Sequence, residues 1–173
     1  MLEESLLINK IRDEFGRVPF PYHRGLRAAM AMDDWVTDVK ILEEITRTKD
    51  FVGEWWEVPV EELSSCMLAH SYLDDHGIEF YLPAYMVAVL EHPLAFDRSG
   101  RSSAWQLIYL MCFDKDKPTE LREHFRATFS RIVGGRKQAC RDFLRFVAAS
   151  SSYNEHANQL AKEALSSEFW AGS

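Results

Sequence analysis

Two pairs of side chains in the middle of the sequence have the types and the spacing that metal sites use. His76 and Glu79 are three residues apart and Cys66 and His70 are four apart, so each pair can share one face of a helix. Together these side chains are of the kind that zinc binds. Helical metal sites, however, use Glu-x-x-His or His-Glu-x-x-His patterns, and neither occurs in this chain. We therefore predict no metal site and no bound cofactor.

Nucleophilic catalysis also lacks a recognisable set of residues. The sequence contains no Gly-x-Ser-x-Gly, no Walker phosphate loop and no Gly-x-Gly-x-x-Gly. A reactive thiol needs exposure and a positive neighbour, whereas Cys112 and Cys140 lie in apolar helical patterns. Cys66 with His70 is the one local Cys/His pair, and burial in a core explains both residues equally well. We predict no catalytic residue and favour a non-enzyme.

The segment EWWEVP, residues 54–59, carries two adjacent tryptophans. Trp55 and Trp56 cannot both point inward from one regular element, so we expect one of them to be partly exposed. An exposed Trp beside Glu is typical of an interface anchor, which makes the pair candidate partner-binding residues. The alternative is that both tuck under the preceding helix as the chain turns.

A basic stripe is expected on one helix in the second half of the chain. Lys137, Arg141 and Arg145 recur at four-residue spacing, and three further residues can extend the stripe: Arg126, Arg131 and Arg136. The stripe is either a solvated face or a binding surface for an anionic partner. Nucleic acid is the less favoured partner, because the chain as a whole has a net charge of −7.

Charge and apolar runs also bear on location. Residues 1–97 hold 8 Lys and Arg against 19 Asp and Glu, and residues 98–173 hold 12 against 8, so the two halves can pack with complementary rims. The longest uncharged run, Phe80–Leu90, is far shorter than the ~17–25 residues that span a bilayer. The acidic start, MLEESLLINK, is unlike a signal peptide, and the three cysteines form no C-x-x-C. We expect a cytoplasmic protein without membrane contact.

Helices are the elements expected to position these residues. Few turn residues, 8 Gly and 6 Pro in 173, and 47% hydrophobic residues favour long helices around a core. We predict an all-α fold in which residues 1–173 form a single domain. Seven or eight helices would pack around two apolar central ones, without strands.

The predicted boundaries come from caps, prolines and apolar spacing. In the first half we expect a helix over Leu7–Phe15 and then an extended stretch over 17–26. A second helix, capped by Asp33 or Asp34, should carry on one face Trp35, Val39, Leu42 and Ile45. A third helix, from Pro59, should carry Leu63, Cys66, Met67, His70 and Leu73. In the second half we expect a helix after Asp74 or Asp75 that kinks or restarts near Leu82 because of Pro83. A loop over 97–103 should follow Pro93, and a capping box at Ser103 and Gln106 should open the next helix. We expect three further helices: one from Pro118, one over 136–150 after Gly134 and Gly135, and a last one over about 154–169.

The aromatic centre of the kinked segment suggests a ligand site as an alternative to a plain core. Tyr81 and Tyr85 are one helical turn apart beside Pro83, and each hydroxyl needs a partner if it is buried. A pocket beside the kink would be lined by the residues His70, His76, Glu79, Tyr81 and Tyr85.

Several motifs resemble an uncharacterised bacterial domain-of-unknown-function family. The matching segments are Val18–Pro21, a lone Trp at position 55 or 56, Tyr81–Tyr85, and Gln138 with Phe143 and Leu144, and they span about residues 7–148. The chain departs from the family pattern at Tyr22, where members have Gly, and at 134–136, where they have a Thr/Ser-Pro-Glu type cap. The resemblance implies a small, bacterial, intracellular protein and carries no catalytic residues.

Three hypotheses about function follow. The preferred one is a non-catalytic protein-interaction module of the antitoxin, immunity or regulatory-adaptor kind, and a homodimer is left open. The second is a small helical enzyme or ligand-binding protein that uses the pocket beside Pro83. The third and weaker one is nucleic-acid binding through Lys137, Arg141 and Arg145.

Overall fold

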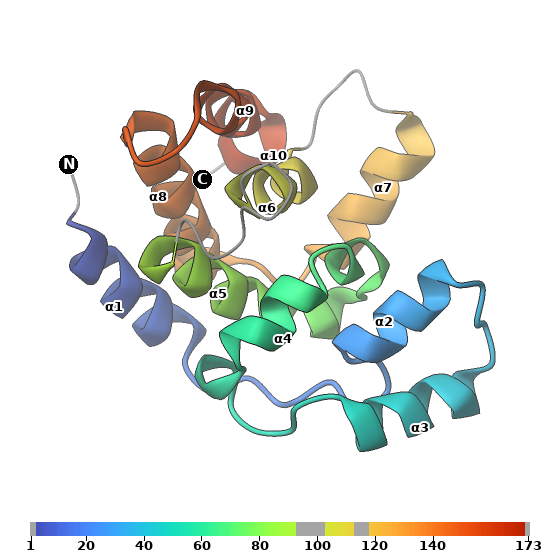
Figure 1. Cartoon of the computed structure of the whole chain (residues 1–173). Coiled ribbons are helices and arrows are strands. Elements are labelled where there is room, and N and C mark those ends of the chain that lie inside the picture. The colour runs from blue at the N-terminus through green and yellow to red at the C-terminus, as the bar shows by residue number, and fades with distance from the viewer. Residues whose placement is uncertain (1–2, 93–102, 113–117, 172–173) are drawn as a thin grey trace.

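All regular elements in the described part of the chain are helices. The computed structural model describes residues 3–92, 103–112 and 118–171, and these contain ten α-helices, two 3-10 helices and no strand (Figure 1). The all-α prediction is confirmed, and eight of the α-helices have eight or more residues. The elements are α1 (Glu4–Phe15), α2 (Leu26–Asp33), α3 (Val39–Lys49), η1 (Trp55–Glu57), α4 (Val60–Ser65), η2 (Ala69–Tyr72), α5 (Asp75–Glu91), α6 (Ser103–Met111), α7 (Thr119–Thr128), α8 (Gly134–Ala149), α9 (Glu155–Ser166) and α10 (Glu168–Ala171).

Helix α5 forms the centre of the fold. The Asp74 carboxylate caps it by accepting a hydrogen bond from the backbone N–H of Gly77 at 2.9 Å, as the sequence predicts. Every residue from Gly77 to Leu90 is buried, because helices α1, α4, α6 and α7 pack around it (Figure 1). Pro83 lies inside a single helix, so the predicted restart does not occur. Packing on all sides offsets the hydrogen bond that proline cannot make.

The other helices form two groups on either side of α5. Helix α1 packs against α5 and α8, α8 packs against α9, and α9 packs against α6. Helix α2 packs against α3 and η2, at the opposite end of the view from α8 and α9 (Figure 1). The second predicted central helix, α6, is largely buried, but Tyr109 is exposed, so it is not enclosed on every side. Among the described residues, no helix has the length and apolar character needed to cross a bilayer.

Helix α2 was not predicted, and the helix expected to follow it begins later than expected. Asp38, not Asp33 or Asp34, is the N-cap of α3, where its carboxylate accepts hydrogen bonds from two backbone N–H groups. Helix α2 has no side-chain cap of its own. Its first N–H groups bind acceptors from the end of α3 instead: Gly25 N–H binds Thr46 Oγ1 at 2.9 Å, and Arg27 N–H binds Asp50 Oδ1 at 2.7 Å. Caps supplied from a distant segment leave no local sequence pattern.

Three further boundaries differ from the prediction. The helix expected from Pro59 to Leu73 ends at Ser65 and is followed by the separate turn η2, although Leu63, Cys66, His70 and Leu73 are all buried. Helix α8 starts at Gly134, before the expected start at 136, and the last predicted helix is divided at Ser167 into α9 and α10. The loop predicted over 97–102 and the side chain of Ser103 lie outside the described residues.

Candidate functional site

Two adjacent tryptophans leave the 3-10 helix η1 in different directions. The turn is closed by Glu54 and Glu57, whose side chains and backbone N–H groups bond reciprocally. Because a 3-10 helix has three residues per turn, consecutive side chains cannot share a direction. Trp55 is fully buried and donates its indole N–H to the carbonyl oxygen of Gly16 at 2.8 Å, whereas Trp56 is 42% exposed. One tryptophan of the pair is therefore available at the surface.

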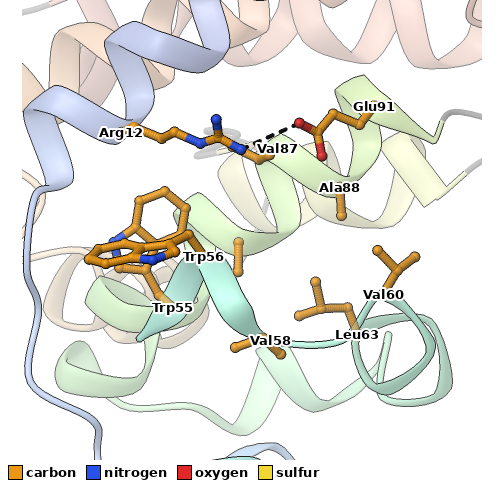
Figure 2. A pocket seen from close by; sticks show the side chains of 10 residues that line it. Arg12, Trp55, Trp56, Val58, Val60, Leu63, Val87, Ala88 and Glu91 are labelled. Atoms are coloured by element: carbon orange, nitrogen blue, oxygen red, sulfur yellow. Dashed lines mark hydrogen bonds and ion pairs between the residues drawn. The ribbon is translucent and has the colours of Figure 1, made fainter. Parts of the chain in front are cut away.

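Trp56 borders a pocket between η1, α4 and α5, which we call the Trp56 pocket (Figure 2). The residues that line it are Arg12, Trp55, Trp56, Val58, Val60, Leu63, Ala84, Val87, Ala88 and Glu91. The lining is apolar apart from the rim, because α5 presents only small or aliphatic side chains here before it ends at Glu91. Helix α4 closes one side through Val60 and Leu63, as Figure 2 shows.

Charged groups are confined to the rim of the Trp56 pocket. Arg12 of α1 reaches across to Glu91 at the end of α5, with 3.5 Å between Nη2 and Oε1 (Figure 2). Both side chains are well exposed, so this ion pair contributes little to stability and can rearrange. The rim therefore offers one positive and one negative group to a visiting molecule, beside an apolar floor.

The volume and the lining decide what this pocket can do. Its volume of about 60 Å³ is far below the roughly 300–1,000 Å³ of sites that enclose small-molecule ligands. No Ser, Thr, Cys, Lys or His lines it, and Glu91 on the rim is the one lining residue that could exchange a proton. A methyl or isopropyl group from another protein is of the right size and polarity to enter it.

A second, shallower depression lies next to the first along the chain. It has a volume of about 290 Å³ and is lined by Arg17, Val18, Pro19, Phe20, Tyr22, Val52, Gly53 and Glu54. Arg17 and Glu54 form an ion pair at 3.7 Å on its edge. Glu54 lines this depression while the next residue, Trp55, lines the Trp56 pocket. The turn at η1 thus contributes to two hollows, and the Val-Pro-Phe-Pro motif forms part of one of them.

Family membership places these features in a wider group of proteins. The model of a family of unknown function, DUF6714, matches residues 3–173. The chain belongs to this family. The match extends on both sides of the segment 7–148 that carries the motifs, and it confirms the resemblance to a domain-of-unknown-function family. No curated protein and no solved structure matches the chain.

The five residues predicted to line a pocket beside Pro83 have four different surroundings in this DUF6714 member. His70 and Tyr85 lie together in the core, with 6.1 Å between ring centroids. Tyr85 donates a hydrogen bond to the carbonyl oxygen of Cys66 at 2.9 Å. Burial lowers the pKa of His70 to about 4, so its ring is neutral near pH 7, and its Nε2 makes no hydrogen bond within the described residues.

Tyr81 is buried beside the start of α2 instead. Its hydroxyl lies near the backbone N–H of Leu26, but no described residue meets the geometry of a hydrogen bond with it. Burial, together with the Asp50 and Glu62 carboxylates, raises the pKa of Tyr81 well above its usual value. A nearby Asp50 oxygen, Oδ2, is also buried without a partner. These groups form a polar cluster in the core, and none of them lines either hollow described above.

His76 and Glu79 lie on other sides of α5. The ring of His76 packs edge-on against the ring of His23, with 5.8 Å between centroids, near the surface. Glu79 is buried and forms ion pairs with Arg131 and Arg136. The structure therefore does not bring the five residues into one pocket, and their role in ligand binding stays a prediction. In the described part of the chain, no three His, Cys, Asp or Glu side chains are placed so that they could hold a metal ion.

The predicted basic stripe is largely occupied by contacts within the protein. Arg145 pairs with Asp142 at 2.8 Å, and Lys137 lies over the ring of Phe169 at 5.1 Å. Arg141 makes no ion pair with a described residue, although its Nε is buried. Among the residues proposed to extend the stripe, Arg131 and Arg136 bind Glu79 and Arg126 lies 3.6 Å from Glu168.

Asp142 ties this part of α8 to α1. Its buried carboxylate accepts hydrogen bonds from Lys10 at 2.7 Å, Arg145 at 2.8 Å and Gln138 at 2.9 Å. Burial alone would raise the pKa of Asp142, but these donors outweigh it and hold the pKa below its ordinary value. Asp142 thus links α1 to α8 and holds Arg145, whereas Lys137 and Arg141 form no ion pair with a described residue.

Sequence reasoning identified the tryptophans but not the pocket beside them. The floor is built by Ala84, Val87 and Ala88, which carry no polar signal and belong to a helix that is buried throughout. A second exposed tryptophan, Trp35, was assigned to a helix face in the sequence, whereas it lies in the turn between α2 and α3. Its position after two aspartates, Asp33 and Asp34, was the one available sign of a turn.

Proposed function

We propose that this DUF6714 member is a non-catalytic protein-interaction module that binds a protein partner through the Trp56 pocket. An aliphatic side chain of the partner would enter the pocket beside the indole of Trp56, and Arg12 and Glu91 would pair with polar groups around it. Antitoxins, immunity proteins and regulatory adaptors act in this way, by tight binding without turnover.

The observation that carries this proposal is a half-exposed indole next to an apolar pocket sized for one side chain. Tryptophan is enriched among the residues that dominate binding energy at protein interfaces, and such residues sit beside pockets that exclude water. Small size and the lack of titratable groups in the floor argue against a substrate site. Nucleic acid is less well supported, because four of the six basic residues pair with carboxylates of the protein: Arg126, Arg131, Arg136 and Arg145.

The test compares partner retention by three variants of the tagged full-length chain, expressed in its own host and analysed by quantitative mass spectrometry. Trp56→Ala removes the indole, and Val60→Arg places a charge at the mouth of the pocket. Leu6→Ala is the matched control, because Leu6 is similarly exposed and lies outside the pocket. Circular dichroism confirms that each variant keeps its helical content.

We expect one stoichiometric partner with the wild type and with Leu6→Ala, and at least a tenfold loss with Trp56→Ala and Val60→Arg. Equal retention by all four proteins would exclude the Trp56 pocket as the binding site. A co-purified metabolite without any protein partner would favour a ligand-binding protein instead. Light scattering on the purified chain tests whether the partner is a second copy.

A further inference from the structure

The turn between α2 and α3 holds a tryptophan in a backbone conformation that normally requires glycine. Helix α2 ends in paired hydrogen bonds, from Val36 N–H to Ala31 C=O at 3.0 Å and from Trp35 N–H to Met32 C=O at 3.0 Å. This is the Schellman pattern, in which the residue at the position of Trp35 is left-handed and most often Gly. Trp35 has φ +65° and is the one non-glycine residue with positive φ among the described residues.

The fold gains nothing visible from the indole that occupies this position. Trp35 is 90% exposed, the highest value for a large apolar side chain in the described part of the chain, and its ring packs against no other aromatic ring there. A bulky residue in a left-handed conformation is strained relative to glycine. Backbone strain that packing does not offset is a reason to look for a function at that residue.

Further exposed apolar residues and several acidic residues adjoin Trp35 in the sequence. Val39 and Ile41, at the start of α3, are 62% and 51% exposed. The charges over residues 33–41 are three aspartates, Asp33, Asp34 and Asp38, against one lysine, Lys40. Asp33 accepts a hydrogen bond from the Tyr72 hydroxyl and Asp38 caps α3, so Asp34 is the aspartate without a described side-chain contact. We call the segment Asp33–Ile41 the Trp35 corner. In Figure 1 it lies at the edge of the molecule farthest from α1 and α8, away from the Trp56 pocket.

We propose that the Trp35 corner docks into a partner protein whose surface carries an apolar cleft bordered by Lys and Arg. The exposed apolar side chains call for an apolar cleft, and the aspartates around them require positive charge at its border. An anionic membrane surface is disfavoured by the same aspartates, which would face lipid headgroups of like charge. This is a second contact surface, and it does not depend on the Trp56 pocket.

The strain at Trp35 makes a sharp test possible. Trp35→Gly supplies the residue that the turn prefers, so it removes the docking group while relieving the backbone. We expect the midpoint of thermal unfolding to rise by about 2–4 °C, which corresponds to the left-handed strain of one residue in a chain of this size. A loss of binding by this variant therefore cannot be attributed to a damaged fold.

The experiment first identifies the partner by contact. The full chain carries the photo-crosslinking residue benzoylphenylalanine in place of Trp35 in living cells, and the crosslinked protein is identified by mass spectrometry. Val133 is the control position, because it is similarly exposed and belongs to neither surface. The purified partner is then titrated with wild type, Trp35→Gly, Trp35→Phe and Asp34→Asn at two salt concentrations.

We expect a crosslinked protein at position 35 that is absent at 133. Trp35→Gly should weaken its Kd at least tenfold, Trp35→Phe should weaken it less, and Asp34→Asn should reduce the association rate mainly at low salt. Crosslinks only to a second copy of the chain, or none, would overturn the proposal, and so would a Kd of Trp35→Gly within twofold of wild type. Binding of the wild type to vesicles with anionic lipid that Trp35→Gly loses would also count against it, because the indole would then serve a membrane surface. If Trp56→Ala alone loses the partner, the Trp56 pocket stands and the Trp35 corner does not.

Discussion

The indole N–H of Trp55 donates a hydrogen bond to the carbonyl oxygen of Gly16, at 2.8 Å. Gly16 ends α1 with φ +52° and ψ −144°, a conformation that side chains with a Cβ rarely adopt. The bond joins the turn η1 to the end of α1, so the buried Trp55 links the two elements that carry Trp56 and Arg12, which both line the Trp56 pocket (Figure 2).

Trp55→Phe is expected to lower the free energy of unfolding by about 2–4 kcal/mol, because it leaves a cavity and a carbonyl without its donor. Trp56→Phe is the matched control one residue away. Because Trp56 is partly exposed and its indole is not needed for this bond, we expect a change below about 0.5 kcal/mol. Urea unfolding followed by circular dichroism measures both. Equal effects of the two substitutions would contradict the structural role of Trp55.

Glu79 supports the fold from inside α5 by pairing with Arg131 and Arg136. The carboxylate is buried, whereas both guanidinium groups are partly exposed. Glu79→Gln should therefore lower the free energy of unfolding by about 2–3 kcal/mol. This is a small loss for a broken buried ion pair, because solvent can still reach the arginines. Glu91→Gln, which removes the exposed partner of Arg12, should cost under about 0.5 kcal/mol. A Glu79 variant as stable as the Glu91 variant would show that the buried pair is not required.

Local signals predicted several helices whose ends are made by their own neighbours in sequence, although the local cap of α3, Asp38, was missed. Gly16 ends α1 and Asp74 starts α5, as expected. Helix α2 was not predicted, because the acceptors of its first N–H groups are distant in sequence: Thr46 lies 21 residues from Gly25, and Asp50 lies 23 residues from Arg27. A cap of this kind exists only after the chain has folded, so no reading of the local sequence could supply it.

The same distinction applies to the candidate site. Adjacent tryptophans in one turn imply that one is exposed, but the choice between Trp55 and Trp56 depends on the carbonyl of Gly16, 39 residues away. His76 and Glu79 have the spacing of metal ligands and were placed in the predicted pocket, yet Glu79 meets arginines that are 52 and 57 residues distant. Residue types show which groups can react or bind, whereas burial and partners, which decide whether they do, are set by tertiary packing.

Tyr81 and Tyr85 offer a comparison of two buried hydroxyls on one helix. The Tyr85 hydroxyl donates to the Cys66 carbonyl at 2.9 Å, whereas that of Tyr81 has no partner among the described residues. Tyr85→Phe should therefore lower the free energy of unfolding by about 1 kcal/mol, because it removes a hydrogen bond. Tyr81→Phe should leave the free energy of unfolding unchanged or raise it by up to about 1 kcal/mol, because an unsatisfied buried hydroxyl is unfavourable. Urea unfolding of both variants measures these changes in stability. A clear loss of stability in Tyr81→Phe would indicate a bound water or ligand on that hydroxyl.

Asp50 makes the stability of the protein depend on pH in an unusual direction. Burial of its carboxyl group is the main cause that raises the pKa of Asp50 from 3.8 to about 6, against the hydrogen bond from the Arg27 N–H. A carboxyl whose pKa is higher in the folded state favours folding while it is protonated. This contribution is complete below about pH 3.8 and is lost as the pH rises through about 6.

Asp50→Asn removes this titration and keeps an oxygen for the Arg27 N–H. Relative to wild type, the variant should therefore gain about 1–2 kcal/mol of stability between pH 5 and pH 8, as expected from the separation of the two pKa values. All other titrating groups are common to both chains and cancel in the difference, including His70, whose lowered pKa acts in the opposite direction. Asp34→Asn, at an exposed position, should show no such trend. A constant difference between Asp50→Asn and wild type from pH 5 to pH 8 would contradict this prediction, because it would mean that Asp50 does not titrate in this range.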